Sequence, residues 1–319
     1  MNNKKRCSRC GGLDIKLNGK YSNKKQRFYC YECKRSFSWN NKKVKRSNEF
    51  VWFKKWLIGG YLIRQIIDIS GKSEKKIRTI INRCLDSPPK DKECDYSKIK
   101  YTIFDASYIW KRKLQITALL DGVTNRLVDG RYDLKENSSF RISSYFFELR
   151  NNGFDPKTLT VDGNTAVIKA AKHVWPNIII QRCLVHIQRQ GLMWCRINPK
   201  TTDAKKLRKL FAEITNINDV KSKKIFIEKL MVWEEKYGNK ISRGKERGWV
   251  FSDLKRARSM ILKSLPDMFH YLEDKNIPRT SNAAEGFFKL AKDRYKIHQG
   301  LAREKKKNFF LWFFYFRKQ

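Results

Sequence analysis

The stretch at residues 278–301, which reads PRTSNAAEGFFKLAKDRYKIHQGL, predicts a helix with two unlike faces. Pro278, Thr280 and Ser281 are typical residues for the start of such a helix. The side chains of one face are apolar and can dock on a core: Ala284, Phe288, Ala291 and Tyr295. The side chains of the other face are polar, with one acid among amide and lysine side chains: Asn282, Glu285, Lys289, Lys292 and Lys296.

Glu285 has two interpretations. An acid on this stripe can hold a divalent cation while the neighbouring lysines hold phosphate groups. Alternatively, Asn282-x-x-Glu285 resembles a capping box, in which Glu285 only accepts a backbone N–H. The spacing alone leaves both open, so partner carboxylates elsewhere in the chain are needed to decide.

The composition narrows the class of protein. The chain has 319 residues, and its 41% hydrophobic content supports a real core. The formal net charge is +40, from 71 Lys and Arg against 31 Asp and Glu. A surface this positive needs a polyanion; nucleic acid is the first candidate and an anionic membrane the second. No run reaches the roughly 18 apolar residues of a spanning helix, and neither a secretory signal nor a dense disulfide pattern is seen, so we expect a protein of the reducing cytoplasm.

Near the N-terminus two C-x2-C pairs, Cys7/Cys10 and Cys30/Cys33, are separated by 19 residues. Four thiolates at this spacing are typical of a tetrahedral structural Zn²⁺ site, although unligated cysteines are the alternative. Residues 1–46 hold 15 Lys and Arg against two acids, with aromatic residues interleaved. We therefore expect a zinc ribbon that contacts either DNA or a protein partner.

Residues 49–86 predict three helices. Gly59-Gly60 separates the first two, and Ser70-Gly71-Lys72 turns the chain into a third helix that Ser73 caps. Its outward side chains include Lys75, Lys76 and Arg78, the candidate DNA contacts. A helix, a short glycine turn and a basic helix are typical of a helix-turn-helix, although an ordinary helical pair has the same pattern.

The next block changes to strand periodicity. Residues 101–105, 114–120 and 126–132 predict three consecutive strands, and strand–helix alternation follows through Leu159–Asp162 and Ile178–Ile180. This order predicts an α/β fold with a mixed sheet and helices packed on it. Asp105 and Asp162 each stand where a short apolar strand is expected to end, which is where open α/β sheets gather their active sites. A plain Asp-Gly turn at Asp162 and an exposed acid at Asp105 are the alternatives.

The segment from about residue 204 to 276 reads as helical and separates Asp162 from Glu285 by 122 residues, so we expect a helical insertion there. Trp233 and Trp249 either stack on a displaced base or belong to the core of this insertion. Residues 302–319 predict a terminal helix that packs on the core, with a membrane-surface foot as the alternative.

The order of these motifs resembles the Asp-Asp-Glu transposases of the Mutator-like insertion-sequence group. The resemblance rests on Asp105, on Val161–Gly163, on the C-x2-H pair Cys183/His186 and on Thr280–Leu301. The four-cysteine ribbon makes the chain look like the zinc-binding variant of that group. The run Asp-Ala-Ser-Tyr around Asp105 fits the family's first-acid motif only loosely, and the chain is short for the family.

The resemblance implies a ribonuclease H-like core whose helical insertion precedes the glutamate. It also implies a catalytic triad of Asp105, Asp162 and Glu285 that binds two Mg²⁺ or Mn²⁺ ions about 4 Å apart and performs DNA cleavage and strand transfer. Cys183 and His186 are expected near this site without a derived role. The helix of residues 278–301 is expected to contact DNA through Asn282, Lys289, Arg294 and His298.

We accordingly predict five segments: a zinc ribbon (1–46), a helix-turn-helix (47–88), the first part of the core (98–200), the insertion (201–277) and the C-terminal helices (278–319). The expected partners are double-stranded DNA, as terminal inverted repeats and target, and further copies of the chain; the expected location is the nucleoid of a prokaryotic cytoplasm. A non-catalytic DNA-binding protein and a ribonuclease H-like nuclease that cuts without joining are the alternatives.

Overall fold

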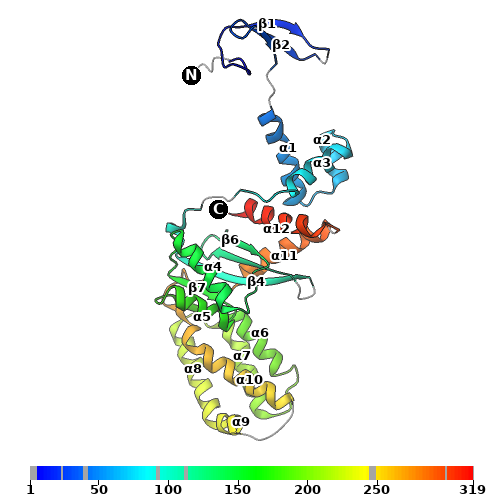
Figure 1. The fold of residues 1–319 in the computed structure, drawn as a ribbon. Helices are drawn as coiled ribbons and strands as arrows, with labels where there is room; N and C mark the ends of the chain where they lie inside the picture. The colour runs from blue at the N-terminus through cyan, green and yellow to red at the C-terminus, as the bar shows by residue number, and fades with distance from the viewer. Residues whose placement is uncertain are drawn as a thin grey trace.

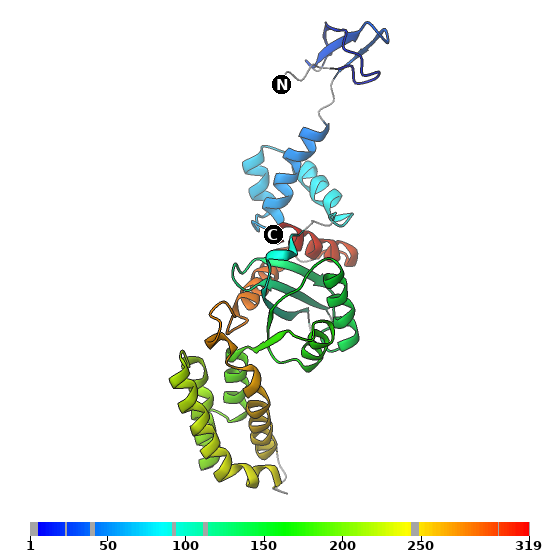
Figure 2. The same ribbon diagram turned by 90° about the vertical axis from the view of Figure 1, so that its left-hand side faces the viewer.

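A computed structural model describes residues 6–22, 24–38, 42–90, 94–110, 114–243, 249–298 and 300–318. The elements follow one another along the length of an extended molecule (Figures 1 and 2). A small sheet near the N-terminus comes first, then three helices, then the two C-terminal helices, then a larger sheet, and finally a group of helices at the opposite end.

The larger sheet has five strands in the order β6-β5-β4-β7-β8. Three of them form an antiparallel meander: β4 (Tyr101–Trp110), β5 (Leu114–Asp121) and β6 (Leu127–Tyr132). The other two run parallel to β4: β7 (Thr158–Val161) and β8 (Ile179–Arg182). This mixed sheet, with its helices, confirms the predicted α/β fold class.

Alternation along the strands divides the sheet residues between two cores. Phe104 and Leu119 pack with α4 (Ser139–Asn151) and α5 (Thr165–Val174) on one face. Their neighbours Ile103 and Ala118 belong to the core that includes α11 (Asn282–Ile297) and α12 (Arg303–Arg317). The sheet is therefore covered on both faces, which explains why its strands read as nearly continuous apolar runs.

The three helices expected between residues 49 and 86 are α1 (Lys42–Leu57), α2 (Ile63–Ser70) and α3 (Glu74–Leu85). Gly71 has a φ of 62°, which permits the turn between α2 and α3. Ser73 caps α3 by accepting the Lys76 backbone N–H at 3.4 Å. These local features follow the sequence prediction closely.

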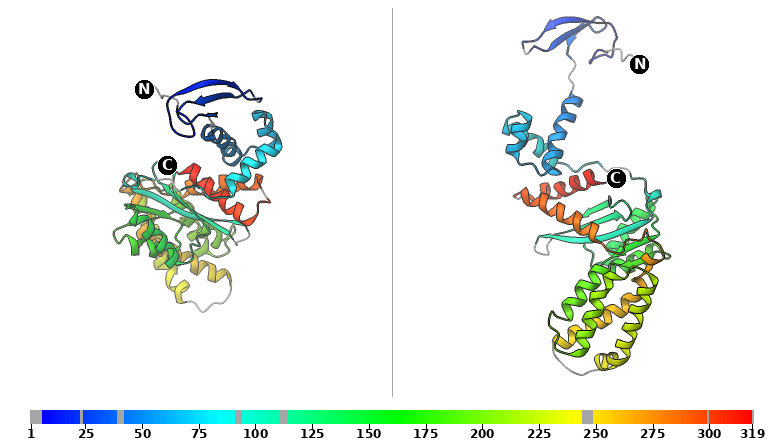
Figure 3. Two further views of the ribbon diagram at one scale, coloured as in Figure 1. Left: turned by 45° about the horizontal axis from the view of Figure 1, so that its top comes forward. Right: turned by 180° about the vertical axis from the view of Figure 1, so that it is seen from behind.

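The helices α1 to α3 share a hydrophobic core with the C-terminal helices. Phe53 and Ile77 belong to the same buried cluster as Phe309 and Phe313 of α12. Figure 3 shows α11 and α12 lying between α1–α3 and the larger sheet. The predicted terminal helix on the core is thus confirmed, and none of the described helices is long and apolar enough to cross a membrane.

His298 lies in this shared core. Its ring stacks on Trp56 with the centroids 4.0 Å apart, and its Nε2 is 2.9 Å from the Trp56 carbonyl oxygen. Arg294 donates from Nε to the carbonyl of Ile58 at 2.7 Å. Both residues were expected to hold phosphates. His298 is only 8% exposed, so its imidazole is not available to DNA. Arg294 is half-buried, and its contact with DNA stays a prediction.

The predicted insertion, residues 201–277, contains α7 (Thr202–Glu213), α8 (Val220–Trp233), α9 (Asn239–Arg243) and α10 (Trp249–Ser264). Its hydrophobic core also includes residues of the preceding helix, α6 (Leu184–Trp194). Trp233 is 3% exposed and donates its indole N–H to the Asp203 carbonyl at 3.0 Å, which makes it a core residue. The side chain of Trp249 lies outside the described residues.

The remaining elements are short. The N-terminal sheet is antiparallel, with the strands β1 (Ile15–Lys20), β2 (Gln26–Cys30) and β3 (Arg35–Phe37). Single turns of helix connect longer elements at Tyr96–Lys98, Ile214–Asn216, Glu234–Gly238, Leu265–Asp267 and His270–Leu272.

Candidate active site and metal-binding clusters

The register between β4 and β7 brings Asp105 and Asp162 side by side. The two strands pair in parallel from Tyr101 with Thr158 to Ile103 with Thr160, an offset of 57 residues. The same offset places Asp105 next to Asp162, just beyond the last paired residues. Asp105 does not end its strand as expected, because β4 continues to Trp110 along β5. What ends at this point is the parallel pairing with β7, and this opens the space in which both carboxylates lie.

A glycine directs the chain away from the sheet after Asp162. Gly163 has a φ of 105°, and a Cβ added there would collide with the guanidinium of Arg182. The Asp162 carboxylate accepts the Asn164 backbone N–H at 2.9 Å, and Asn164 caps α5 by accepting the Ala166 N–H. The Asp-Gly pair therefore forms a turn that also presents Asp162 at the sheet edge, so the two interpretations of this pair are not exclusive.

The segment before α11 is tied to the ends of β7 and β8. Thr160 donates its hydroxyl to the Pro278 carbonyl at 2.7 Å, and the Leu184 N–H donates to the Arg279 carbonyl at 3.0 Å. The Ser281 N–H donates to the Cys183 sulfur at 3.2 Å. These bonds place the first turn of α11 over the same sheet edge as the two aspartates.

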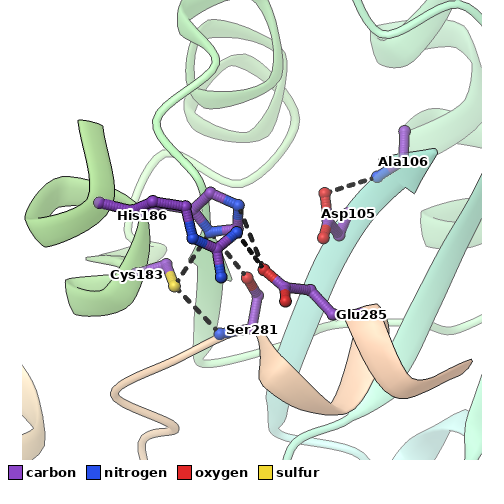
Figure 4. A network of polar contacts seen from close by, with 7 residues as sticks. Asp105, Ala106, Cys183, His186, Ser281 and Glu285 are labelled. Carbon is purple, nitrogen blue, oxygen red and sulfur yellow. Dashed lines mark hydrogen bonds and ion pairs between the residues drawn. The ribbon is translucent and has the colours of Figure 1, made fainter. Parts of the chain in front are cut away.

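Glu285 is held in that first turn by basic side chains (Figure 4). Its Oε1 lies 3.2 Å from Arg189 Nη1 and 3.5 Å from His186 Nε2. Asn282 is already the first residue of α11 and Ser281 is its N-cap, so the predicted capping box from Asn282 to Glu285 does not match this helix start. The carboxylate points across the helix start toward α6 instead of back along its own backbone.

Cys183 and His186 gain a structural role from this arrangement. His186 Nδ1 is 3.2 Å from Cys183 Sγ and 3.3 Å from Ser281 Oγ. The hydrogen bond to Cys183 raises the pKa of His186 to about 9, although burial opposes the shift. Burial also opposes the lowering of the Cys183 pKa, but the bonds from His186 and Ser281 outweigh it. At neutral pH a protonated imidazole therefore connects the C-x2-H pair to Glu285.

A further acid, Glu136, lies beside the two aspartates and was not predicted. Carboxylate oxygens of Asp105, Glu136 and Asp162 all lie within 4.8 Å of one another. The signal was present in the strand order: β6 is antiparallel to β5 and hence runs in the direction of β4, so residues that follow β6 reach the same sheet edge. Sequence reasoning considered only acids at the expected strand ends and passed over one four residues further on.

Two of the three acids have a raised pKa, because they are buried and lie beside other negative charges. Burial, followed by the charge of Asp162, raises the pKa of Asp105 to about 7. Burial, followed by the charges of Asp162 and Asp105, raises the pKa of Glu136 to about 7. Like charges taken out of water favour the protonated form. The positive charge of His186 opposes the rise in the pKa of Asp105 but does not cancel it.

This cluster fits a divalent cation by its donor chemistry. Carboxylate oxygens are the preferred ligands of Mg²⁺ and Mn²⁺. Oxygens on opposite sides of an octahedral Mg²⁺ stand about 4.2 Å apart, and the oxygens here lie within 4.8 Å of one another. One cleft is lined by the predicted triad and by basic side chains of α6 and α11: Asp105, Asp162, Glu285, His186, Lys289 and Lys292. The acids and the lysines thus face a common space.

The four N-terminal cysteines form a second cluster. Their sulfurs lie within 4.8 Å of one another, with Cys7 and Cys33 3.8 Å apart and Cys10 and Cys30 3.6 Å apart. Thiolates bound at about 2.3 Å in a tetrahedron stand about 3.8 Å from each other, whereas a disulfide is close to 2 Å. The geometry therefore fits Zn²⁺, and the cysteines are free thiols.

The basic residues of α3 differ in how far they are committed to intramolecular pairs. Lys76 lies 2.8 Å from Glu49 of α1, and Arg78 lies 2.7 Å from Glu74. The hydrogen bond from Lys76, against the effect of burial, lowers the pKa of Glu49. Lys75, Arg78 and, on α11, Asn282 and Lys289 are exposed. Contact of these side chains with DNA stays a prediction.

The chain thus combines an α/β domain, whose acidic cleft at one sheet edge could bind a divalent metal ion, with a four-cysteine cluster and a three-helix segment. Residues 131–282 match the family model described as "Transposase, Mutator family", so the chain carries a Mutator-family transposase domain. The match includes Asp162, Cys183 and His186, while Asp105 and Glu285 lie on either side of it. No curated protein matches the chain.

Proposed function

We propose that this chain cleaves DNA at the ends of a mobile element and joins those ends to target DNA. The observation that supports this most is a single cleft lined by Asp105, Asp162 and Glu285, in a chain that carries a Mutator-family transposase domain. The three acids come from β4, from the end of β7 and from α11. A net charge of +40 suits a DNA substrate.

The residues of the cleft would divide the work as follows. Asp105, Asp162 and Glu285 would hold Mg²⁺ or Mn²⁺, which when bound supplies Lewis-acid activation of an attacking oxygen and neutralises charge at the phosphate. Lys289 and Lys292 line the same cleft and would hold phosphate oxygens on either side of the scissile bond. His186, protonated at neutral pH, would keep the Glu285 carboxylate directed across the cleft.

The N-terminal segments would recognise the element ends. The four-cysteine sheet, held by structural Zn²⁺, and the basic helix α3 would contact duplex DNA, with Lys75, Lys76 and Arg78 on phosphates or base edges. Because α1 to α3 share a core with α11, DNA held on α3 would keep a defined position relative to the cleft. Joining two ends at once requires at least two copies of the chain, and a nucleoid location in the cytoplasm follows from the substrate.

The test uses duplexes that carry the inverted repeats flanking the reading frame. Asp162→Asn should reduce Mg²⁺-dependent nicking and strand transfer at least about 1,000-fold, because an amide replaces a charged ligand. End binding in a mobility-shift assay should stay within twofold. Asp121→Asn is the matched control, since Asp121 also precedes a glycine but ends the antiparallel β5, whose C-terminus lies at the opposite sheet edge.

Three results would overturn parts of this proposal. Full cleavage by Asp162→Asn refutes the triad. Cleavage by the unaltered chain without strand transfer points to a nuclease of the ribonuclease H type. Salt-sensitive end binding with neither reaction, in Mg²⁺ and in Mn²⁺, points to a non-catalytic DNA-binding protein.

A further inference from the structure

The buried amide of Gln115 makes two hydrogen bonds with Glu136. Glu136 lies between β6 and α4, where Gln115 Nε2 donates to its Oε1 at 2.9 Å and its own backbone N–H donates to Gln115 Oε1 at 3.2 Å. Gln115 is on β5 and is only 1% exposed. Both ends of the carboxamide are therefore used on a single residue, and its burial prevents it from turning toward water.

Placing Glu136 here costs electrostatic free energy, which a purely structural role in the loop would not require. Glu136 is held next to Asp105 and Asp162, and like charges in a poorly solvated site repel one another. Within the described part of the chain, none of the three forms an ion pair with a lysine or arginine side chain; Glu285, by contrast, contacts Arg189. Acids that are half-buried or buried side by side, without a basic partner, are stabilised by a bound cation or by protonation.

The four acids consequently fall into two groups. Asp105, Glu136 and Asp162 have oxygens close enough to share one ion, whereas Glu285 faces them from α11 and is already paired with basic side chains. The three-acid group requires no movement of α11. Its acids come from β4, from the turn that follows β7 and from the loop that follows β6, where the amide on β5 holds Glu136.

We infer that Glu136 is a further ligand of the divalent cation held by Asp105 and Asp162, and that Gln115 is its positioning residue. The inference rests on the proposed function and specifies how its cation is bound before DNA arrives. Glu136 contributes a carboxylate oxygen to the ion, directly or through a metal-bound water. Gln115 keeps that carboxylate turned into the cluster, as hydrogen-bond partners of metal ligands commonly do.

The test measures Mn²⁺ binding to the full-length, zinc-loaded chain without DNA, by the electron paramagnetic resonance signal of free Mn²⁺. Glu136→Gln keeps the size of the side chain and an acceptor for Gln115, but removes the charge. We expect it to raise the Kd for Mn²⁺ at least about tenfold. Glu235→Gln, which neutralises an exposed acid of the insertion, is the matched control and should stay within twofold.

Gln115 is tested by two variants, Gln115→Leu and Gln115→Asn. The first removes both hydrogen bonds, and the second keeps an amide that is one methylene too short to make them. Each should raise the Kd for Mn²⁺ by about three- to tenfold, while Glu136→Gln combined with Gln115→Asn should be no worse than Glu136→Gln alone. Full additivity of the two effects would overturn the positioning role, because it would mean that Gln115 acts without Glu136.

Asp162→Asn separates a failure of this inference from a failure of the proposed function. If Asp162→Asn weakens Mn²⁺ binding but Glu136→Gln does not, only the role given to Glu136 is overturned. If neither variant changes Mn²⁺ binding, the cleft is not a cation site and the proposed function fails with it. Loss of binding in both variants, with melting temperatures close to that of the unaltered chain, supports the inference.

Discussion

The molecule contains two clusters of metal-ligating side chains that are built in opposite ways. The cysteine cluster uses four residues within 27 positions of one another, on a small sheet with little else to hold it. The carboxylate cluster uses residues 31 and 57 positions from Asp105, with Glu285 a further 123 positions beyond Asp162, on a sheet covered on both faces. The cysteine cluster depends on the spacing of residues close in the sequence, whereas the carboxylate cluster depends on the register of the strands.

The two clusters should therefore depend on their metal ions differently. The core of the small sheet consists of Cys7, Cys30 and Phe37, with a few partly buried neighbours, so most of its stability must come from the ion. The carboxylate cluster adds repulsion to a scaffold that already has two large cores. Metal removal should unfold the first and leave the second folded.

Zinc removal gives the largest expected effect. Chelation should unfold β1 to β3, because the ion supplies on the order of 10 kcal/mol to such a ribbon, and should leave the unfolding of the larger sheet unchanged. Amide hydrogen exchange of Phe28–Cys30 against Leu119–Leu120 measures both regions in one sample. If β2 stays protected from exchange after chelation, the small sheet does not depend on its metal ion for folding. End binding should weaken before the cleft is affected.

The pH dependence of the carboxylate cluster comes next. The pKa values of Asp105 and Glu136, about 7, lie above the 3.8 and 4.5 of free side chains. The folded state thus binds more protons, so the stability contributed by protonation is full below pH 4 and is lost as the pH rises through about 7. Bound Mn²⁺ should offset this loss of stability.

This prediction is measured as the shift in melting temperature on adding Mn²⁺, which should be larger at pH 8 than at pH 5. The same comparison with Glu136→Gln should show a smaller difference between the two pH values, because one titrating partner is gone. An equal Mn²⁺ shift at both pH values in the unaltered chain would contradict the repulsion ascribed to the cluster.

Gly163→Ala probes the turn that presents Asp162. Its φ of 105° is strained for any residue with a Cβ, and that Cβ would displace Arg182, so we expect a loss of about 2 kcal/mol in the free energy of unfolding. Gly286→Ala is the control, since a Cβ there meets nothing within 4 Å and alanine favours the helix. Urea denaturation measures the free energy of unfolding of both variants. Equal values would mean that the turn at residue 163 accepts a Cβ without strain.

Arg189→Gln is expected to have the smallest effect. The Arg189 side chain is 62% exposed, and an exposed ion pair of this kind is worth less than about 1 kcal/mol. His186→Gln should cost more, because His186 also contacts Cys183 and Ser281 within the joint between α6 and α11. If Arg189→Gln lowers the melting temperature more than His186→Gln, the exposed Arg189 contributes more than His186 to holding Glu285.

Much of the fold followed from local patterns. The strand periods, the helix of residues 278–301, the Ser73 cap and the Ser70-Gly71-Lys72 turn were all readable, because each depends on neighbours a few residues away. The prediction for His298 was wrong for a different reason. A basic residue on a helical stripe looks solvent-facing until another segment packs on it, and α1 does so here.

The sequence by itself determined the residue types at the two clusters, the spacing of the four cysteines and the alternation that makes an α/β sheet. Only the tertiary structure decided that Glu136 joins Asp105 and Asp162, that Glu285 points at His186, and that α1 to α3 share a core with α11 and α12. The physical reason is that a turn or a cysteine pair brings together residues already close in the chain. Strand register, by contrast, brings together residues that are far apart in the sequence, and their spacing along the chain does not predict the contact.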